Sequence, residues 1–315
     1  MRWLAILNPA SGALSGHGRT AALAAWLREE AGISVAVSDA PGQPEILARD
    51  AADYDGLLAA GGDGTVAEVV NGMDRGRQIL ALLPAGTGNG LARDLGLALL
   101  GRGPRATDRR PALAQIAATL HTPRIHRIDL IDVQFRRHPE DAWITRLAVG
   151  TTAIGYAAEV VALARGPLAD LSRRLPAGLC YPLGATLQVL RQRPFDIHFA
   201  LDDQPPTACR VTNLMVHSTA HAGNFRAFPA ARPDDGCLTV LLADAAPMAQ
   251  LRHNLAVLRQ SYGFVTAEAR PARSAVLLSA RPLRLMLDGE LVDDVTEVRW
   301  TVLAGALRVA LMDGS

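Results

Sequence analysis

Three acidic side chains stand beside glycines at two places far apart in the chain. Asp63 lies in GGDGT, which joins an apolar run to a helical pattern, and Asp288 and Glu290 lie in LRLMLDGEL. A carboxylate beside a glycine-rich bend can hold Mg²⁺ or accept a proton from a hydroxyl group. We therefore treat all three as candidate catalytic residues, and Asp63 also as a candidate metal ligand.

The loop around the first aspartate has the composition of a phosphate-binding bend. Gly61, Gly62 and Gly64 lack Cβ atoms, so the backbone can approach a polyphosphate closely and adopt positive φ without strain. Thr65 and Glu68 have the T-x-x-E spacing of a capping box, which predicts a helix N-terminus directly after the loop. Free N–H groups and the positive end of the helix dipole attract phosphate there. A plain glycine-rich turn with the aspartate as a cap explains this one motif equally well.

A second glycine-rich loop strengthens the phosphate interpretation. LPAGTGNGLARDLG, residues 83–96, again follows an apolar run and precedes a helical pattern. Two such loops after successive strands are hard to explain as turns alone. The late DGE has a simpler alternative, an Asp-Gly hairpin turn. On an extended chain, however, Asp288 and Glu290 would point the same way and reach one cleft.

The elements that must position these residues begin with an α/β pattern. Up to residue 126, short apolar runs alternate with amphipathic stretches, which predicts a doubly wound, mainly parallel sheet in a nucleotide-binding domain. The predicted strands are 3–7, 33–37, 55–60 and 79–83, and the predicted helices are 20–31, 44–52, 66–73 and 112–121. Ligands in such sheets lie beyond the carboxyl ends of the strands, where the loops NPASG, GGDGT and PAGTGNG would converge.

Residues 127–315 follow a different pattern, of short alternating strands, which is typical of a β-rich, sandwich-like domain. The predicted strands are 128–135, 143–150, 195–202, 209–218, 237–244, 275–280, 283–289, 297–303 and 307–312. A helical interlude at 157–192 interrupts them. The last segment is a candidate to pack back on the first domain, and we place an apolar trough for a ligand between the two domains.

Composition excludes several classes of protein. A net charge of +1 gives no basis for bulk nucleic-acid binding. All 32 basic side chains are arginine, so chemistry that needs a lysine ε-amino group, such as a Walker-type loop, is unavailable. No apolar run approaches the ~18 residues of a membrane span, and the N-terminal run is too short for a signal peptide. We expect a cytoplasmic protein that touches a membrane only from outside.

Cysteines and histidines give weaker signals. Cys180, Cys209 and Cys237 are far apart and odd in number, which favours reduced thiols over disulfides or zinc ligation. His217 and His221 are four residues apart, but the segment resembles a strand end and no glutamate follows, which argues against zinc. No G-x-S-x-G motif supplies a hydrolase serine.

Taken together, NPASG, GGDGTVAEVVNG, LPAGTGNGLARDLG, PDDGCLTV and the late DGE resemble the diacylglycerol kinase catalytic family, which includes bacterial lipid kinases and the sphingosine and ceramide kinases. The resemblance covers nearly the whole chain, in order. It implies an active cleft between a nucleotide domain and a β-rich domain. It also implies that ATP and Mg²⁺ serve to phosphorylate a hydroxyl of a diacylglycerol or sphingoid-type lipid, as in phospholipid biosynthesis. A soluble-substrate kinase such as NAD kinase, and a non-catalytic nucleotide- or lipid-binding protein that kept the fold, remain open as alternatives.

The resemblance implies roles for single residues. Glu290 matches the residue usually proposed as the catalytic base, with Asp288 beside it, and Asp63 matches an aspartate assigned to Mg²⁺ or to the base. The implied nucleotide-binding residues are Asn8, Pro9, Ala10, Ser11, Gly12, Ser38, Gly61, Gly62, Asp63, Gly64, Thr65, Val66, Ala67, Glu68, Thr87 and Asn89.

Metal binding is the part of the resemblance in which this chain departs from the family. Asp235, with Arg232 and Cys237, falls where bacterial members hold a structural Mg²⁺. Gly90 stands where many bacterial members have an aspartate that organises the metal, whereas the sphingosine-kinase branch has a small residue there. We hypothesise that Asp94, one helical turn or about 5.4 Å further along, compensates in part.

The expected partner is a lipid substrate at a membrane surface. The interlude carries five arginines, which favours docking on an anionic bilayer, and a solvated helix face is an equal alternative. Those arginines are Arg165, Arg173, Arg174, Arg191 and Arg193. The pattern does not name the lipid and leaves the oligomeric state open, a homodimer included.

Overall fold

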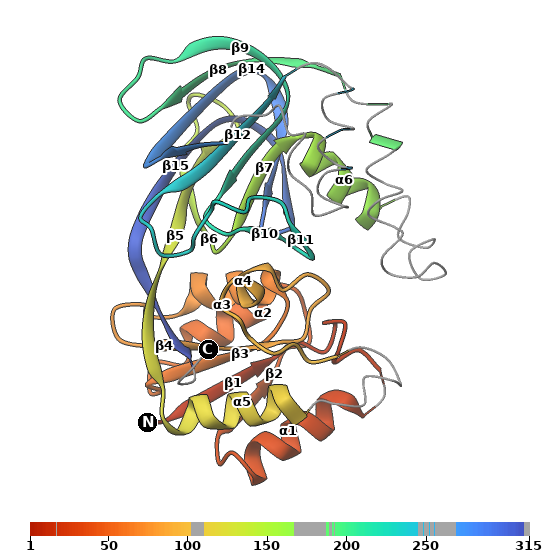
Figure 1. The fold of residues 1–315 in the computed structure, drawn as a ribbon, viewed down its shortest axis with the longest axis vertical. Coiled ribbons are helices and arrows are strands. Elements are labelled where there is room, and N and C mark those ends of the chain that lie inside the picture. The colour runs from red at the N-terminus through yellow and green to blue at the C-terminus, as the bar shows by residue number, and fades with distance from the viewer. Residues whose placement is uncertain are drawn as a thin grey trace.

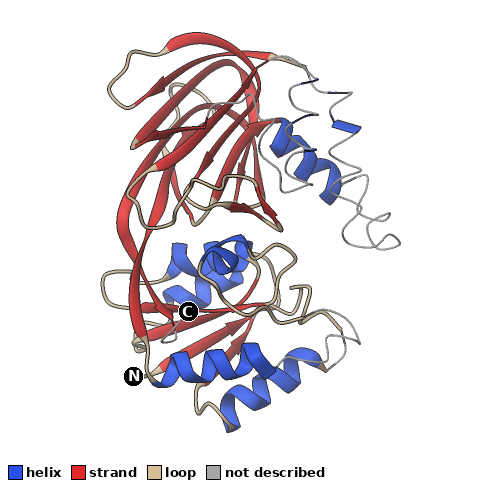
Figure 2. Cartoon of the chain, in the orientation of Figure 1, coloured by secondary structure: helices blue, strands red, loops and turns tan. Residues whose placement is uncertain are grey.

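The computed structural model describes residues 1–16, 18–101, 110–166, 193–244 and 269–311, with single positions at 187, 188, 191, 248, 252 and 255. Figures 1 and 2 show two halves, one α/β and one rich in strands. The helices are α1 (Arg19–Glu29), α2 (Gln43–Arg49), α3 (Asp63–Gly72), α4 (Gly90–Asp94), α5 (Arg110–His121) and α6 (Tyr156–Arg165). The strands are β1 (Trp3–Leu7), β2 (Ser34–Val37), β3 (Gly56–Gly61), β4 (Ile79–Pro84), β5 (Arg124–Arg136), β6 (Ile144–Ala148), β7 (Thr151–Gly155), β8 (Phe195–Leu201), β9 (Thr207–His217), β10 (His221–Ala222), β11 (Phe225–Arg226), β12 (Leu238–Asp244), β13 (Ala269–Ala272), β14 (Ser274–Leu287) and β15 (Glu290–Leu311).

The α/β half, made of β1–β4 and α1–α5, is a doubly wound parallel sheet, as predicted. β2, β1, β3 and β4 pair in parallel in that order. Helices α1 and α5 cover one face, where Leu27 and Ile116 pack with Leu7, and α2, α3 and α4 cover the other (Figure 1). Because both faces are covered, β1 and β3 are buried along their whole length, which is why they stand out as apolar runs.

The start of α3 differs from the prediction. The helix begins at Asp63, with Gly62 as its N-cap and no side-chain cap. Thr65 and Glu68 do not form a capping box, because the Thr65 hydroxyl accepts a hydrogen bond from Asn8 Nδ2 (2.9 Å) and Glu68 Oε2 accepts one from the Gly42 N–H (3.1 Å). The helix therefore brings the aspartate itself to its first turn.

The β-rich half continues the same sheet rather than forming a separate one. Among the described residues the sheet has thirteen strands, and β15 joins the two halves. It pairs with β14 and β5 in antiparallel fashion and then lies beside β4 in parallel, at Val309 and Leu80. Figure 1 shows β5 and β15 running together from one half to the other. The β-rich, sandwich-like class was predicted correctly, but this continuity was not predicted.

Several predicted strands have other limits. Residues 143–150 contain β6 and the turn to β7, and β7 itself was not predicted. Segments 275–280 and 283–289 are one strand, β14, and segments 297–303 and 307–312 both fall on β15. Irregular pairing at 278–283 and at 303–307 bends these long strands without ending them. Of the predicted interlude, α6 is described, and residues 167–186, which include Arg173 and Arg174, lie outside the described part.

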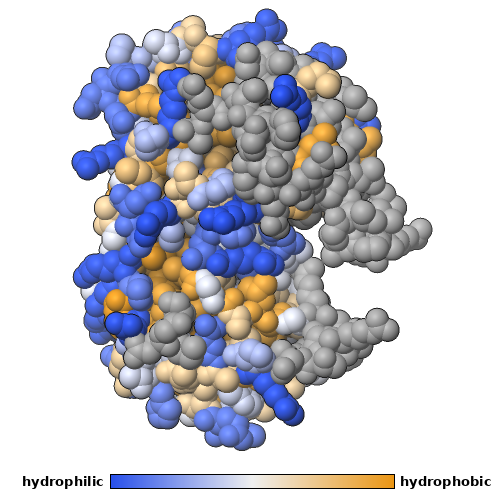
Figure 3. All heavy atoms as spheres, in the orientation of Figure 1, coloured by the Kyte–Doolittle hydropathy of each residue, from blue (hydrophilic) through white to orange (hydrophobic). Residues whose placement is uncertain are grey.

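Side-chain contacts tie the halves together beside the site. The Asn71 amide, on α3, pairs with the backbone of Leu147 on β6, donating to its carbonyl (2.9 Å) and accepting from its N–H (3.0 Å). Arg146 forms an ion pair with Glu45 on α2 (2.8 Å). On the face shown in Figure 3, hydrophilic side chains form a band across the middle of the molecule. Among the described helices, none is both long enough and apolar enough to span a bilayer.

Candidate active site

Three glycine-rich loops meet at the carboxyl ends of β1, β3 and β4. Asn8 in the first loop donates to Thr65 in the second. The N–H of Ala13 donates to the Ala85 carbonyl (2.8 Å), and the N–H of Ala85 donates to the Gly61 carbonyl (2.8 Å). The loops thus form one hydrogen-bonded surface, in which the N–H groups of residues 89–91 at the start of α4 donate to Asp63 and the first turn of α3 is the candidate phosphate site.

Close packing of backbone explains glycine at two of these positions. A Cβ on Gly62 would lie 3.0 Å from the Gly86 Cα, and a Cβ on Gly86 would meet the Gly62 Cα. None of Gly61, Gly62 and Gly64 adopts positive φ, so close approach of backbone, rather than a left-handed conformation, accounts for Gly62. The second loop crosses the first at this point, and larger residues would separate them.

Some of the predicted nucleotide-binding side chains are already engaged. The Asn89 amide accepts from the Gly86 N–H (2.9 Å) and donates to the Gly86 carbonyl (3.0 Å), so it shapes its own loop. The Ser38 hydroxyl is buried and donates to the Leu7 carbonyl (3.2 Å). Val66 packs in the core. Asn89, Ser38 and Val66 can therefore contact a ligand through backbone atoms more readily than through their side chains.

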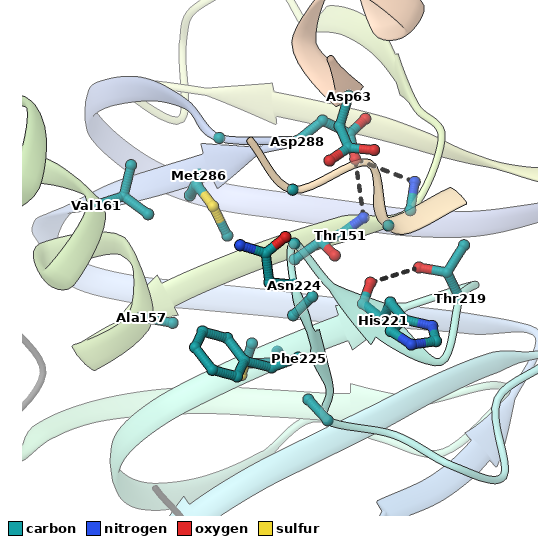
Figure 4. Close-up of a pocket in the computed structure, with 18 of the residues that line it drawn as sticks. Asp63, Thr151, Ala157, Val161, Thr219, His221, Asn224, Phe225, Met286 and Asp288 are labelled. Atoms are coloured by element: carbon teal, nitrogen blue, oxygen red, sulfur yellow. Dashed lines mark hydrogen bonds between the residues drawn. The ribbon is translucent and has the colours of Figure 1, made fainter. Parts of the chain in front are cut away.

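A cavity of about 350 Å³ lies between the two halves. Among the predicted residues, Asp63, Gly64, Thr87 and Asp288 line it. Its other wall is apolar and comes from α6, β9, β11 and β14 (Figure 4). The apolar lining residues are Tyr156, Ala157, Val160, Val161, Met215, Phe225 and Met286. The remaining predicted nucleotide residues, Asn8–Gly12, Ser38, Gly61, Gly62, Thr65–Glu68 and Asn89, do not line this cavity in the described part of the chain.

Asp288 sits in a nest of three backbone donors. Its Oδ2 accepts from the Val149 N–H (2.7 Å), and its Oδ1 accepts from those of Gly150 (3.0 Å) and Thr151 (2.9 Å). Asp288 and Gly289 have φ of 46° and 92°, so they form the tight turn between β14 and β15 rather than an extended chain. The expected Asp-Gly hairpin turn and the expected carboxylate in a cleft are therefore the same feature.

The carboxylates of Asp63 and Asp288 face each other at one end of the cavity, one from each half (Figure 4). The pKa of Asp288 is raised to about 7, mainly by burial and in smaller part by the nearby Asp63 charge, while its three backbone N–H donors lower it. Burial also raises the pKa of Asp63, which the backbone N–H groups of residues 89–91 oppose. Two such groups side by side favour a proton or a cation between them.

Glu290 does not share this position. It pairs with Leu287 across the turn and, within the described residues, is not on the cavity wall. Its charge instead helps to raise the pKa of Glu68, after the larger effect of burial. Asp288 and Glu290 do not lie on one extended stretch of chain, because residues 288–289 form the Asp-Gly hairpin turn that was the simpler alternative.

The donor set fits Mg²⁺. This ion prefers oxygen ligands and is commonly bound by one or two carboxylates together with substrate phosphates. Asp63 and Asp288 supply two carboxylates, and the described residues contain no group of three or more acidic, histidine or cysteine side chains that could hold a metal alone. We expect Asp63 to hold the ion together with phosphate, with the Asp288 carboxylate opposite it.

The predicted structural Mg²⁺ site at Arg232, Asp235 and Cys237 is less complete. The Asp235 carboxylate accepts from the Cys237 N–H (2.9 Å), and Arg232 pairs with Asp234 (3.3 Å). Of the three predicted side chains, only Asp235 offers a carboxylate. The site remains a prediction that needs backbone carbonyls.

A residue that the sequence did not single out organises that loop. Asp129 is 2% exposed, and its carboxylate accepts from the N–H groups of Gly236 and Gly305, both at 2.7 Å. It therefore links β5, the loop before β12 and β15. The sequence around Asp129 is an ordinary alternating strand, so it does not indicate that this aspartate holds three segments together.

His221 and Asp94 form an ion pair between the halves. The Asp94 carboxylate contacts His221 Nδ1 and accepts from the His221 N–H (3.2 Å). The Asp94 carboxylate is engaged by this histidine, and the hypothesis that it replaces the missing metal ligand stays a prediction. A Cβ on Gly90 would lie 2.8 Å from the His221 carbonyl oxygen, so an aspartate would not fit there without moving the halves apart.

His217 is the last residue of β9 and is fully buried. Its Nδ1 is 3.2 Å from the Thr151 hydroxyl, and its ring packs on Phe228. No histidine-containing metal cluster occurs within the described ranges, and zinc was not expected.

Comparison with known proteins identifies relatives along the whole chain. Residues 2–130 match the model of the diacylglycerol kinase catalytic domain, and residues 150–311 match that of the YegS C-terminal NAD kinase beta sandwich-like domain. A "Diacylglycerol kinase" of Staphylococcus saprophyticus is 27% identical over 76% of this chain and 71% of its own length. The protein named "Probable lipid kinase YegS-like" of Stenotrophomonas maltophilia is 25% identical over 99% of this chain and 97% of its own.

Solved structures support the same fold. The crystal structure of a diacylglycerol kinase from Bacillus anthracis strain Sterne superposes with a TM-score of 0.71, at 19% identity, over 99% of this chain and 97% of that one. At that identity the likeness concerns the fold.

Proposed function

Because this chain belongs to the diacylglycerol kinase family, whose catalytic domain implies the use of ATP, we propose that it transfers the γ-phosphate of ATP to the hydroxyl of a diacylglycerol or sphingoid-type lipid. The observation that carries the proposal is the cavity itself, which is apolar along one wall and ends at two carboxylates. An acyl chain fits the apolar wall by the hydrophobic effect, and a hydroxyl fits the carboxylate end. The acceptor would be drawn from a membrane surface.

Asp288 is the residue best placed to accept the hydroxyl proton. Its carboxylate faces the cavity, and a pKa near 7 suits a general base at neutral pH. The nest of N–H donors at residues 149–151 holds it in place. As the lipid oxygen bonds to the γ-phosphorus, the bond to the β-phosphate oxygen breaks, the hydroxyl proton passes to Asp288, and ADP leaves.

The glycine loops and the first turn of α3 would hold the triphosphate through backbone N–H groups. Mg²⁺, when bound by Asp63, would supply positive charge that offsets the charge of the phosphates and would leave the Asp288 carboxylate free to act as the base. Asp63 lies against the N–H groups at the start of α4, which keep its carboxylate directed toward Asp288. In a chain without lysine, Arg165 is a cation on the described cavity wall and a candidate counter-charge.

Two alternatives are weaker. An NAD kinase activity would require a polar acceptor to fill a cavity whose α6 wall is apolar. A non-catalytic binding protein was suggested by Gly90 alone, and the close approach of His221 accounts for that glycine without loss of activity.

The test is an acceptor panel with γ-labelled ATP, offering diacylglycerol, sphingoid base, ceramide and NAD to the same protein. We expect label in one lipid class, dependent on Mg²⁺. Label transferred to NAD, or to no acceptor although ATP binds, would refute lipid phosphorylation.

A further inference from the structure

A second hollow, of about 500 Å³, lies away from the carboxylate cavity. One wall is the loop after α3, with Asp74, Arg75 and Gly76, and the other is the strand pair β5–β15 at Arg127 and Arg308. Its volume lies within the ~300–1,000 Å³ typical of ligand sites. It adjoins the place where β5 and β15 pass between the halves (Figure 1). We call it the hinge pocket.

Two of its three arginines lie directly opposite each other. Arg308 on β15 pairs in register with Arg127 on β5. Like charges opposite each other on antiparallel strands are about 5 Å apart at Cβ and destabilise the pairing. Arg75, half-buried, adds a third positive charge from the α/β half.

The same strand pair also contains an arginine that has a carboxylate directly opposite it. At its other end, Arg136 on β5 lies opposite Glu297 on β15, and the two form an ion pair of 2.7 Å. In the part of the chain that the structure describes, none of Arg75, Arg127 and Arg308 forms an ion pair. The carboxylate expected opposite an arginine is missing from this position.

Backbone carbonyls hold Arg127 and Arg308, and both side chains keep N–H donors free. Arg308 donates from Nη2 to the Gly76 carbonyl (2.9 Å), and Arg127 donates from Nη1 to the Gly305 carbonyl (3.3 Å). A guanidinium has five N–H donors, so each retains several for a ligand. Asp74 is the one carboxylate among the described lining residues, and its Oδ1 accepts from the Gly76 N–H (3.0 Å).

We propose that the hinge pocket binds a dianionic phosphate group, either free phosphate or a phosphate monoester. Planar guanidinium groups that converge from two sides recognise phosphate through paired N–H donors. The anion would take the place of the missing carboxylate between Arg127 and Arg308 and would join them to Arg75 on the other half. The pocket lies at the far end of α3 from Asp63, about 15 Å away along the helix, so it is distinct from the phosphate loops.

The test measures melting temperature with inorganic phosphate against sodium chloride of equal ionic strength. At ~100 times the dissociation constant, we expect phosphate to raise the melting temperature by on the order of 5 °C. Arg127→Gln should abolish most of this rise and, because it relieves repulsion, should melt no lower than wild type in phosphate-free buffer. Arg75→Gln, whose side chain donates no hydrogen bond within the described ranges, should lose the response as well, so the test stands even if Arg127→Gln folds poorly.

Arg77→Gln is the matched control, since Arg77 is exposed on the same loop but does not line the pocket. It should respond like wild type. A second experiment compares co-sedimentation with phosphatidic acid vesicles and with phosphatidylcholine vesicles, which separates a lipid phosphate monoester from free phosphate. Co-sedimentation that depends on Arg75 identifies the lipid as the ligand. If the protein does not co-sediment but still responds to inorganic phosphate, the ligand is the free anion. No rise with phosphate, or an equal rise in Arg75→Gln and Arg127→Gln, would overturn the proposal, because the anion would then bind elsewhere.

Discussion

At the scale of single residues, the account depends on which of two acidic groups next to one turn faces the substrate. Asp288 faces the cavity and is held by three N–H groups, whereas Glu290 lies beyond the turn. Asp288→Asn should therefore lower kcat by about 10²–10⁴-fold while ATP binding persists. Glu290→Gln, the matched control two residues further along the same motif, should stay within a few-fold of wild type.

Initial rates at saturating ATP, with nucleotide affinity measured separately, check this assignment. A large loss in Glu290→Gln together with a mild effect of Asp288→Asn would return the role of base to Glu290, the residue that the family resemblance implied.

The pH dependence of stability follows from the same carboxylates. Burial raises the folded pKa values of Asp63 and Asp288, so the stability that goes with their protonated forms is present below their ordinary pKa and is lost as pH rises. For Asp288 this loss is complete once the pH passes about 7. For Asp288, a rise from 3.8 to about 7 corresponds to at most on the order of 4 kcal/mol. In EDTA, wild type should therefore lose stability between pH 5 and 8 through these groups.

Asp63→Asn removes one of the two charges and the repulsion acting on Asp288. Its melting temperature in EDTA should exceed that of wild type at pH 8, and the difference should shrink toward pH 5. Adding Mg²⁺ with ADP should raise the wild-type value more than the mutant value. Parallel melting curves for the two proteins across this pH range would contradict the coupling of the carboxylates.

At the scale of elements, α4 is the piece that brings the halves together. It begins at Gly90, against the His221 carbonyl, and ends at Asp94, which pairs with the His221 side chain. The Asn-Gly sequence that departs from the bacterial pattern is therefore explained by contact between elements, not by the metal. An aspartate at this position would need space that β10 occupies.

Gly90→Ala tests that contact. The added methyl group would crowd the His221 carbonyl, and we expect a loss of about 1–3 kcal/mol in the free energy of unfolding. Gly64→Ala is the matched control, because a Cβ there meets nothing within 4 Å and alanine favours the helix. Urea denaturation of both variants measures the difference. Equal stability would show that α4 and β10 are not tightly packed.

At the scale of the whole molecule, the sequence predicted local structure, that is, the single strands and loops. The four strands of the α/β half were predicted to within one residue. Burial on both faces makes β1, β3 and β4 continuous apolar runs that end at glycine loops, whereas β2 is partly exposed. Strands β14 and β15 were each divided in two, since Pro282 and Gly305 resemble strand breakers when neighbouring strands are unknown.

Long-range partners could not be predicted from the sequence. Asp94 and His221 are 127 positions apart, and the nest for Asp288 is made of backbone N–H groups that leave no side-chain pattern. Asp63 and Asp288 were each recognised from local glycine motifs, but the sequence did not show that they face each other. Only the path of β15 through both halves brings the second carboxylate to the first.

The central claim is that the cavity between the halves takes the lipid acceptor. Val161 lies on its apolar wall, so Val161→Trp should narrow it and raise the KM for a long-chain acceptor at least several-fold, with the affinity for ATP unchanged. Ile125→Trp, at an exposed isoleucine of β5, is the control. Steady-state rates over a series of acyl-chain lengths are the measurement. A penalty that grows with chain length in Val161→Trp alone is the predicted result, and long-chain kinetics identical to wild type would contradict the account.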